Sequence, residues 1–154
     1  MAHSISETLK SLNITLPEAP APAANYVPYV VSGNMVYVSG QLPKNDAGLM
    51  TGKLGADVDL DTGAKAAEAC ALALLAQLKE ACGGDLDRLK QVVKLTGFVN
   101  STPDFTDHPV VINGASDLIA KICGGKGAHS RVAVGVASLP LGVAVEIDGT
   151  FEIE

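Results

Sequence analysis

The chain has 154 residues, a length typical of one domain with its own hydrophobic core. Its 11 basic and 17 acidic side chains give a net charge of −6, which disfavours a surface that binds the phosphates of a nucleic acid. Hydrophobic residues make up 47% and charged residues 18% of the chain, so the composition predicts a folded globule and excludes general disorder.

Neither the cysteines nor the histidines are spaced as in common metal sites. The three cysteines are odd in number and lack a C-x-x-C pair, which favours free thiols in a reducing compartment over a disulfide framework or a zinc site. The three histidines are far apart in the sequence. No apolar run is long enough for a membrane helix, and the first residues do not resemble a signal peptide. The sequence therefore predicts a cytoplasmic protein with no metal, no cofactor and no membrane partner.

A short helix and an extended segment are predicted near the N-terminus. The residues Ser4-Ile5-Ser6-Glu7 have the S-x-x-E form of a capping box, which predicts a helix to about Leu12. Prolines and alanines between 17 and 28 favour an extended connection. The runs 29–31 and 35–39 are β-branched and aromatic and flank a Ser-Gly-Asn turn, so they predict a hairpin.

Two helices and a central strand are predicted in the middle of the chain. Apolar residues recur every three or four positions over 64–82, and two glycines follow, as is typical of an amphipathic helix and its end. The apolar and β-branched run 89–99 predicts a strand. A second helix is expected after it and ends by Cys123.

The last part of the chain is predicted to be another hairpin. Strands 131–138 and 143–154 flank a Leu-Pro-Leu-Gly turn. A turn centred on Pro140-Leu141 places the three valines of the first strand on one apolar face, opposite Gly149, Ile147 and Val145. The order of elements indicates an α+β fold, in which two helices pack on one face of a mixed or mostly antiparallel sheet. Two helices cannot cover both faces, so the other face is expected to meet water or another subunit.

Arg131 has two possible roles in this hairpin. The same register places Arg131 and Glu146 on one face, roughly 13 Å apart at 3.3 Å per residue, so a small ligand could span much of the gap between them. Alternatively, Arg131 forms an exposed ion pair with the diagonal Asp148. The strand pattern alone favours the ion pair, because polar sheet faces are usually solvated.

Two blocks of sequence resemble a known family. The block NYVPYVVSGNMVYVSGQLP at 25–43 and the block HSRVAVGVASLPLGVAVEI at 129–147 are similar to the Rid proteins, the reactive intermediate deaminase family, also called YjgF-type or endoribonuclease L-PSP-like. The resemblance covers 21–154, and 1–20, the N-terminal helix and Pro/Ala arm, are typical of a longer subgroup. It implies a chorismate-mutase-like fold and a homotrimer with ligand clefts between subunits.

The resemblance also implies roles for two charged residues. Arg131 occupies the position of the family arginine that binds the carboxylate of a 2-imino or enamine acid. A planar guanidinium suits this role, because it can donate two parallel charge-assisted hydrogen bonds to a carboxylate. Glu146 occupies the position of the glutamate that orients or activates the attacking water. Both are therefore candidate catalytic residues.

Four further residues are candidate substrate-binding residues by the same resemblance. They are Tyr26, which lines the cleft; Gly40, whose backbone approaches the ligand; Ala133, through its backbone; and Asn113. The chain departs from the family pattern at Ala133, where many relatives have cysteine, so thiol chemistry is not expected there. About four extra residues before Asn113 leave the substrate range open.

Three functions are compatible with the sequence. The first is cofactor-free hydrolysis of 2-imino acids and their enamine tautomers, of the 2-aminoacrylate type, to 2-keto acids and ammonia. The second is a non-catalytic module on the same trimer that binds small carboxylates. The third, an endoribonuclease, conflicts with the net charge of −6 and the lack of a basic stripe, so no nucleic-acid partner is expected.

Overall fold

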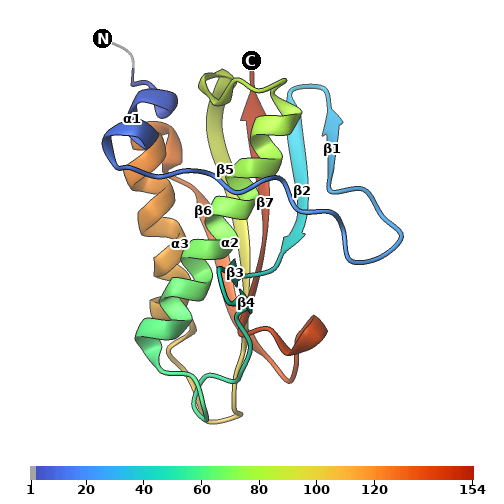
Figure 1. Cartoon of the computed structure of the whole chain (residues 1–154), viewed down its shortest axis with the longest axis vertical. Coiled ribbons are helices and arrows are strands. Elements are labelled where there is room, and N and C mark those ends of the chain that lie inside the picture. The colour runs from blue at the N-terminus through green and yellow to red at the C-terminus, as the bar shows by residue number, and fades with distance from the viewer. Residues whose placement is uncertain (1–2) are drawn as a thin grey trace.

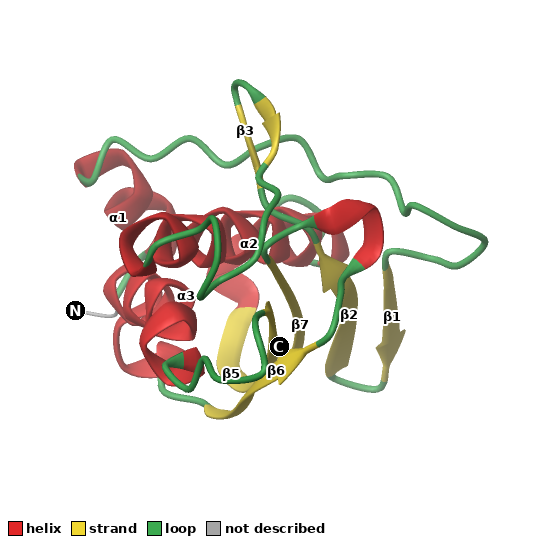
Figure 2. Ribbon diagram, turned by 90° about the horizontal axis from the view of Figure 1, so that it is seen from below, coloured by secondary structure: helices red, strands yellow, loops and turns green. Residues whose placement is uncertain are grey.

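The computed structural model describes residues 3–154 as a five-stranded sheet with two long helices on one face (Figures 1 and 2). The helices are α1 (Ile5–Ser11), α2 (Leu60–Ala81) and α3 (His108–Cys123). The sheet runs in the order β1 (Tyr29–Ser32), β2 (Met35–Gln41), β7 (Val145–Ile153), β5 (Leu89–Asn100) and β6 (Ser130–Val136). A small separate hairpin is formed by β3 (Lys44–Asn45) and β4 (Gly48–Leu49). The predicted α+β fold is confirmed.

The N-terminal helix begins at the predicted cap. The Ser4 hydroxyl accepts a hydrogen bond from the backbone N–H of Glu7 at 3.2 Å. The carboxylate of Asp87 accepts a second bond, from the N–H of Ile5 at 2.7 Å, and so ties α1 to the turn before β5. After α1 the chain is extended and crosses α2 on its way to β1 (Figure 1), where Gln77 donates to the carbonyl of Pro20 at 2.6 Å.

Helix α2 starts four residues earlier than the apolar period predicted. The carboxylate of Asp59 accepts a hydrogen bond from the N–H of Thr62 at 2.8 Å and caps the first turn. Polar residues in this first turn concealed the true start. At the other end Gly83 and Gly84 have φ of 67° and 97°, a conformation in which glycine avoids steric strain.

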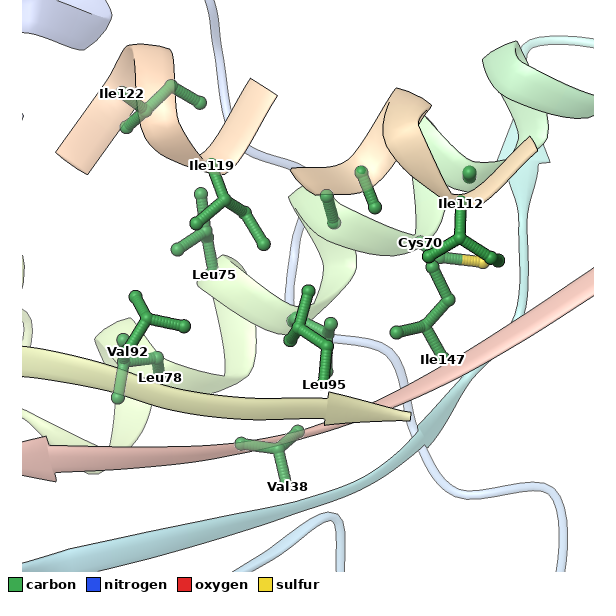
Figure 3. Packing of buried hydrophobic residues seen from close by; sticks show 14 of the residues in the cluster. Val38, Cys70, Leu75, Leu78, Val92, Leu95, Ile112, Ile119, Ile122 and Ile147 are labelled. Carbon is green, nitrogen blue, oxygen red and sulfur yellow. The ribbon is translucent and has the colours of Figure 1, made fainter. Parts of the chain in front are cut away.

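The core lies between the helices and the inner face of the sheet. Leu75 and Leu78 of α2 and three isoleucines of α3 point toward Leu95 and its neighbours on the strands (Figure 3). The two helices approach closely at Gly114, where a methyl group would overlap the carbonyl oxygen of Ala64. The three cysteines are buried free thiols, as predicted. No helix within residues 3–154 is both long and apolar enough to cross a membrane.

The predicted hairpin between the last two strands is wrong. Strand β5 lies between them and pairs with β6 in parallel and with β7 in antiparallel orientation, with Leu95 opposite Arg131 and Phe98 opposite Glu146. Helix α3 is a crossover that returns the chain parallel to β5. The segment 137–144 then leads past β5 to the gap beside β2, where β7 pairs on both edges. A turn signal cannot distinguish this connection from a hairpin.

The side chains of β6 also face the opposite way from the prediction, which placed the valines on the face of Val145 and Arg131 on the face of Glu146. Val132 and Val134 are 43% and 39% exposed on the sheet face opposite the helices, where Tyr37 of β2 is 48% exposed. Arg131 pairs with the buried Leu95 and therefore points to the helix side. Among the described residues no helix covers the other face (Figure 2), which agrees with the expectation that two helices cover only one.

Candidate functional site

Arg131 is half-buried between β6 and α3, where neutral groups hold its guanidinium. Nη1 donates to the hydroxyl of Ser116 at 3.0 Å, and Nη2 donates to the carbonyl of Pro109 at 3.1 Å. No Asp or Glu within residues 3–154 forms an ion pair with it. The pairing with Asp148 considered from the sequence is therefore wrong, because that carboxylate lies on the opposite face of the sheet. Within residues 3–154 the positive charge of Arg131 therefore has no counter-ion.

Ser116 and His129 continue the hydrogen bonding behind Arg131. The Ser116 hydroxyl lies 2.9 Å from Nε2 of His129, and Nδ1 of the same ring lies 2.6 Å from the carbonyl oxygen of Gly127. Neither Ser116 nor His129 is among the site residues predicted from the sequence. One signal was available, because His129 lies two positions before Arg131, next to the start of β6, and alternate residues of an extended segment share a face.

Glu146 lies on β7, on the face of the sheet that the helices leave uncovered. Its carboxylate rests against Gly40 of β2, so closely that a side chain at that position would overlap it. Burial, and to a smaller extent the negative charge of Asp148, raises the pKa of Glu146. This carboxyl group therefore takes up a proton at a higher pH than an exposed glutamate does.

Tyr26 and Gly40 line one hollow of about 220 Å³. Its remaining walls are mainly prolines and alanines of the extended arm, together with Leu42 and Leu141, so it is largely apolar. Because Gly40 also touches Glu146, the structure brings three of the predicted residues together at one end of β2 and β7. In this position the arm is one wall of a candidate binding site.

The other two predicted residues lie elsewhere. Ala133 is half-buried on β6, two positions from Arg131 and on the same face. Asn113 is exposed on α3 and lines a groove between α2 and α3, beside Glu68. No hydrogen bond joins Asn113 to Arg131 in the described part of the chain. In a single chain Arg131 and Ala133 therefore share a face of β6, whereas Asn113 lines the groove between α2 and α3.

A further polar pair lies toward the other end of β6. Nε2 of His108 is 3.2 Å from the hydroxyl of Ser101, and its ring meets the ring of Phe105 edge to face with centroids 5.3 Å apart. The imidazole lies directly over Gly135, where a side chain would overlap it. These four residues line a hollow of about 320 Å³, and the carbonyl that Arg131 reaches belongs to Pro109, the residue after His108.

The cysteines do not supply a nucleophile to any of these places. Burial raises the pKa of the Cys70 thiol, and it raises the pKa of Cys123 to about 12. Since the thiolate is the reactive form, both groups stay protonated and inert near neutral pH. The polar chemistry of the candidate site therefore comes from a guanidinium and a carboxyl group.

Comparison with known proteins places the chain in a family. The pattern of the family described as "YjgF/chorismate_mutase-like, putative endoribonuclease" matches residues 7–147. The chain belongs to the YjgF/Rid family. The YjgF/chorismate mutase-like fold expected from the two sequence blocks is thus confirmed.

Several members of the YjgF/Rid family are similar to this chain. Protein TCP17 of Trypanosoma cruzi is 55% identical over 151 residues, which cover 97% of this chain and 94% of that protein. The crystal structure of Atu1372 from Agrobacterium tumefaciens, of unknown function, is 51% identical with a TM-score of 0.90 and covers 97% of this chain and 92% of its own. The crystal structure of TdcF of E. coli with bound serine is 26% identical with a TM-score of 0.61. The match covers 89% of this chain and 94% of TdcF.

Proposed function

We propose that this YjgF/Rid protein hydrolyses 2-imino acids and their enamine tautomers, of the 2-aminoacrylate type, to 2-keto acids and ammonia. The observation that carries the proposal is the guanidinium of Arg131, which in the described part of the chain is held by Ser116 and a carbonyl group but by no carboxylate. A half-buried guanidinium without a counter-ion is suited to receive a ligand carboxylate. The serine bound to TdcF also carries a carboxylate, which supports this class of ligand.

The proposed chemistry needs one water molecule and a route for protons. Water adds to the carbon of the C=N bond, and the resulting aminoalcohol loses ammonia to leave the ketone. The Glu146 carboxylate takes a proton from the water and returns it to the departing nitrogen, so no net proton is consumed by the protein. The raised pKa of Glu146 suits both steps, because a group that titrates closer to neutral pH can accept and donate.

The site is proposed to lie between copies of the chain in a homotrimer. Arg131 and Glu146 are on opposite faces of one sheet, so a cleft that contains both needs Arg131 from one copy and Glu146 from another. In that cleft Tyr26 and the backbone of Gly40 accompany Glu146, the backbone of Ala133 accompanies Arg131, and Asn113 belongs to the rim. The exposed valines and tyrosine of the uncovered sheet face support contact between copies.

A coupled assay tests this function. An L-amino-acid oxidase generates the imino acid, semicarbazide competes for it, and the release of the 2-keto acid is followed with and without the protein. The proposal expects faster keto-acid release with the wild-type chain and none above buffer with Arg131→Ala. Wild-type protein that leaves the buffer rate unchanged overturns it.

A non-catalytic carboxylate-binding module is the second candidate. The separation of Arg131 from Glu146 within one chain favours it, because the guanidinium can bind an anion without the glutamate. This candidate expects saturable binding of a 2-keto acid in a calorimeter and no turnover in the coupled assay. An endoribonuclease, the activity named in the family description, is disfavoured by the net charge of −6.

A further inference from the structure

Three side chains form a continuous hydrogen-bond chain that ends on the guanidinium of Arg131. Nη1 of Arg131 is 3.0 Å from the Ser116 hydroxyl, which is 2.9 Å from Nε2 of His129. Nδ1 of His129 is 2.6 Å from the carbonyl oxygen of Gly127. The three side chains are half-buried and come from α3, from β6 and from the residue just before β6.

With a single proton on the His129 ring, the partners determine the direction of every hydrogen bond. A carbonyl oxygen only accepts, so Nδ1 of His129 carries the ring proton and donates to Gly127. Nε2 is then an acceptor and receives the proton of the Ser116 hydroxyl. An arginine only donates, so the Ser116 oxygen accepts from Arg131. Each group therefore has one role in this tautomer.

This arrangement fixes the guanidinium without neutralising it. Ser116 holds Nη1 and the carbonyl of Pro109 holds Nη2, so both ends of the planar group are fixed. Two bonds leave three of the five N–H donors of the guanidinium free of any partner among residues 3–154. A carboxylate at the position of Ser116 would hold Arg131 as well, but it would compete with an incoming anion.

We propose that Ser116 and His129 are positioning residues that hold the Arg131 guanidinium in place for the carboxylate of the ligand. The proposal rests on the proposed function of Arg131 and adds the two residues on which its orientation depends. Ser116 acts through Arg131, and His129 acts through Ser116 by fixing the direction of its hydroxyl. Neither residue touches the ligand.

The first test measures the arginine itself and needs no ligand. In ¹⁵N spectra, a guanidinium that is held at both Nη atoms rotates slowly and gives separate Nη signals, which Arg131→Lys identifies by their loss. Ser116→Ala is expected to merge these signals, and Ser116→Thr, which keeps the hydroxyl, is expected to preserve them. Ser130→Ala is the matched control. Ser130 lies on β6 beside Arg131, but its hydroxyl donates to the carbonyl of Val93 and not to Arg131. If Ser116→Ala leaves the Arg131 signals unchanged, the positioning role is overturned.

The second test measures binding of 2-ketobutyrate by calorimetry in the same variants. Ser116→Ala is expected to weaken binding about tenfold, as for the loss of one hydrogen bond, and Ser116→Thr to restore it. His129→Phe is expected to resemble Ser116→Ala, whereas His129→Gln, which keeps an acceptor for Ser116, binds more tightly than His129→Phe. Equal affinity of Ser116→Ala and wild type overturns the proposal, whereas wild-type protein that binds no 2-keto acid overturns the proposed function instead.

Discussion

Arg131 and Glu146 lie on opposite faces of one sheet, on two strands separated by β5. Arg131 is paired with the buried Leu95 and points toward α3, whereas Glu146 is paired with Phe98 and points away from the helices. Neither the hollow beside Gly40 nor the hollow beside His108 is lined by Arg131 or Glu146. If both act on one ligand, two copies of the chain must meet at the site.

Mixed oligomers test this consequence. Arg131→Ala and Glu146→Gln are each expected to be inactive in the imine assay. Co-expressed chains that assemble at random in a closed ring regain about a quarter of the sites, because a working site needs an intact Arg131 from one copy and an intact Glu146 from the next. A mixture no more active than either parent contradicts a site shared between copies.

The raised pKa of Glu146 predicts a pH-dependent cost in stability. Burial and the nearby Asp148 raise the pKa in the folded state, so the fold binds the proton more tightly than the unfolded chain does. Ionisation therefore destabilises the fold as the pH rises above the unfolded value of about 4.3. Glu146→Gln is expected to melt at a higher temperature than wild type at pH 7, and the gap should close on acidification toward pH 4. A difference in melting temperature that does not change with pH would contradict ionisation of Glu146 as the cause. Asp148→Asn, which removes the repulsion, should make the effect of Glu146→Gln on the melting temperature smaller.

Asp87 is expected to stabilise the N-terminal helix with the opposite pH dependence. Although burial opposes ionisation, hydrogen bonds from Ile5, Ser6 and Ser4 lower the pKa of Asp87. Its contribution is therefore present above the unfolded value of about 3.9 and disappears as the pH falls through the folded pKa. Asp87→Asn is expected to cost about 1 kcal/mol and to speed hydrogen exchange in α1. The exposed Asp104→Asn should change neither quantity, and unchanged exchange in Asp87→Asn would contradict the role of this contact.

Gly114 is predicted to set the spacing between α2 and α3. A methyl group there overlaps the Ala64 carbonyl, and backbone cannot rotate away as a flexible side chain can. Gly114→Ala is expected to lower the free energy of unfolding by about 1–3 kcal/mol in urea, as for other overpacked cores. Gly125→Ala is the control, because nothing lies within 4 Å of the added carbon. Equal stability of the two variants would show that the helices can move apart at little cost.

Local signals predicted most of the elements. The capping box at Ser4 marks the start of α1, and the alternation around the Ser-Gly-Asn turn predicts β1 and β2. These features depend on neighbours in the sequence, so a short window contains them. The start of α2 was placed too late because Asp59 caps a polar first turn, which the apolar period does not include.

Long-range pairing could not be predicted in the same way. Whether β7 pairs with β6 or with β5 depends on the path of α3 and on the open edge of β2, neither of which the Leu-Pro-Leu-Gly segment encodes. The error in pairing also reversed the faces, since Val132 was placed on the same face as Val145 and lies instead on the uncovered face of the sheet, where it is exposed. Ser116 was missed because a serine on a helix carries no signal until β6 is placed beside it.

The affinity of a small 2-keto acid for Arg131 variants tests the central claim most directly. 2-Ketobutyrate is titrated by calorimetry into wild type, Arg131→Ala and Arg131→Lys. Wild type can donate two hydrogen bonds to the ligand carboxylate, Arg131→Ala can donate none, and Arg131→Lys offers a single cationic contact. Wild type is expected to bind, Arg131→Ala to lose at least about a hundredfold in affinity, and Arg131→Lys to recover only part of it. Arg131→Ala that binds 2-ketobutyrate as tightly as wild type would contradict the assignment of this guanidinium to the ligand carboxylate.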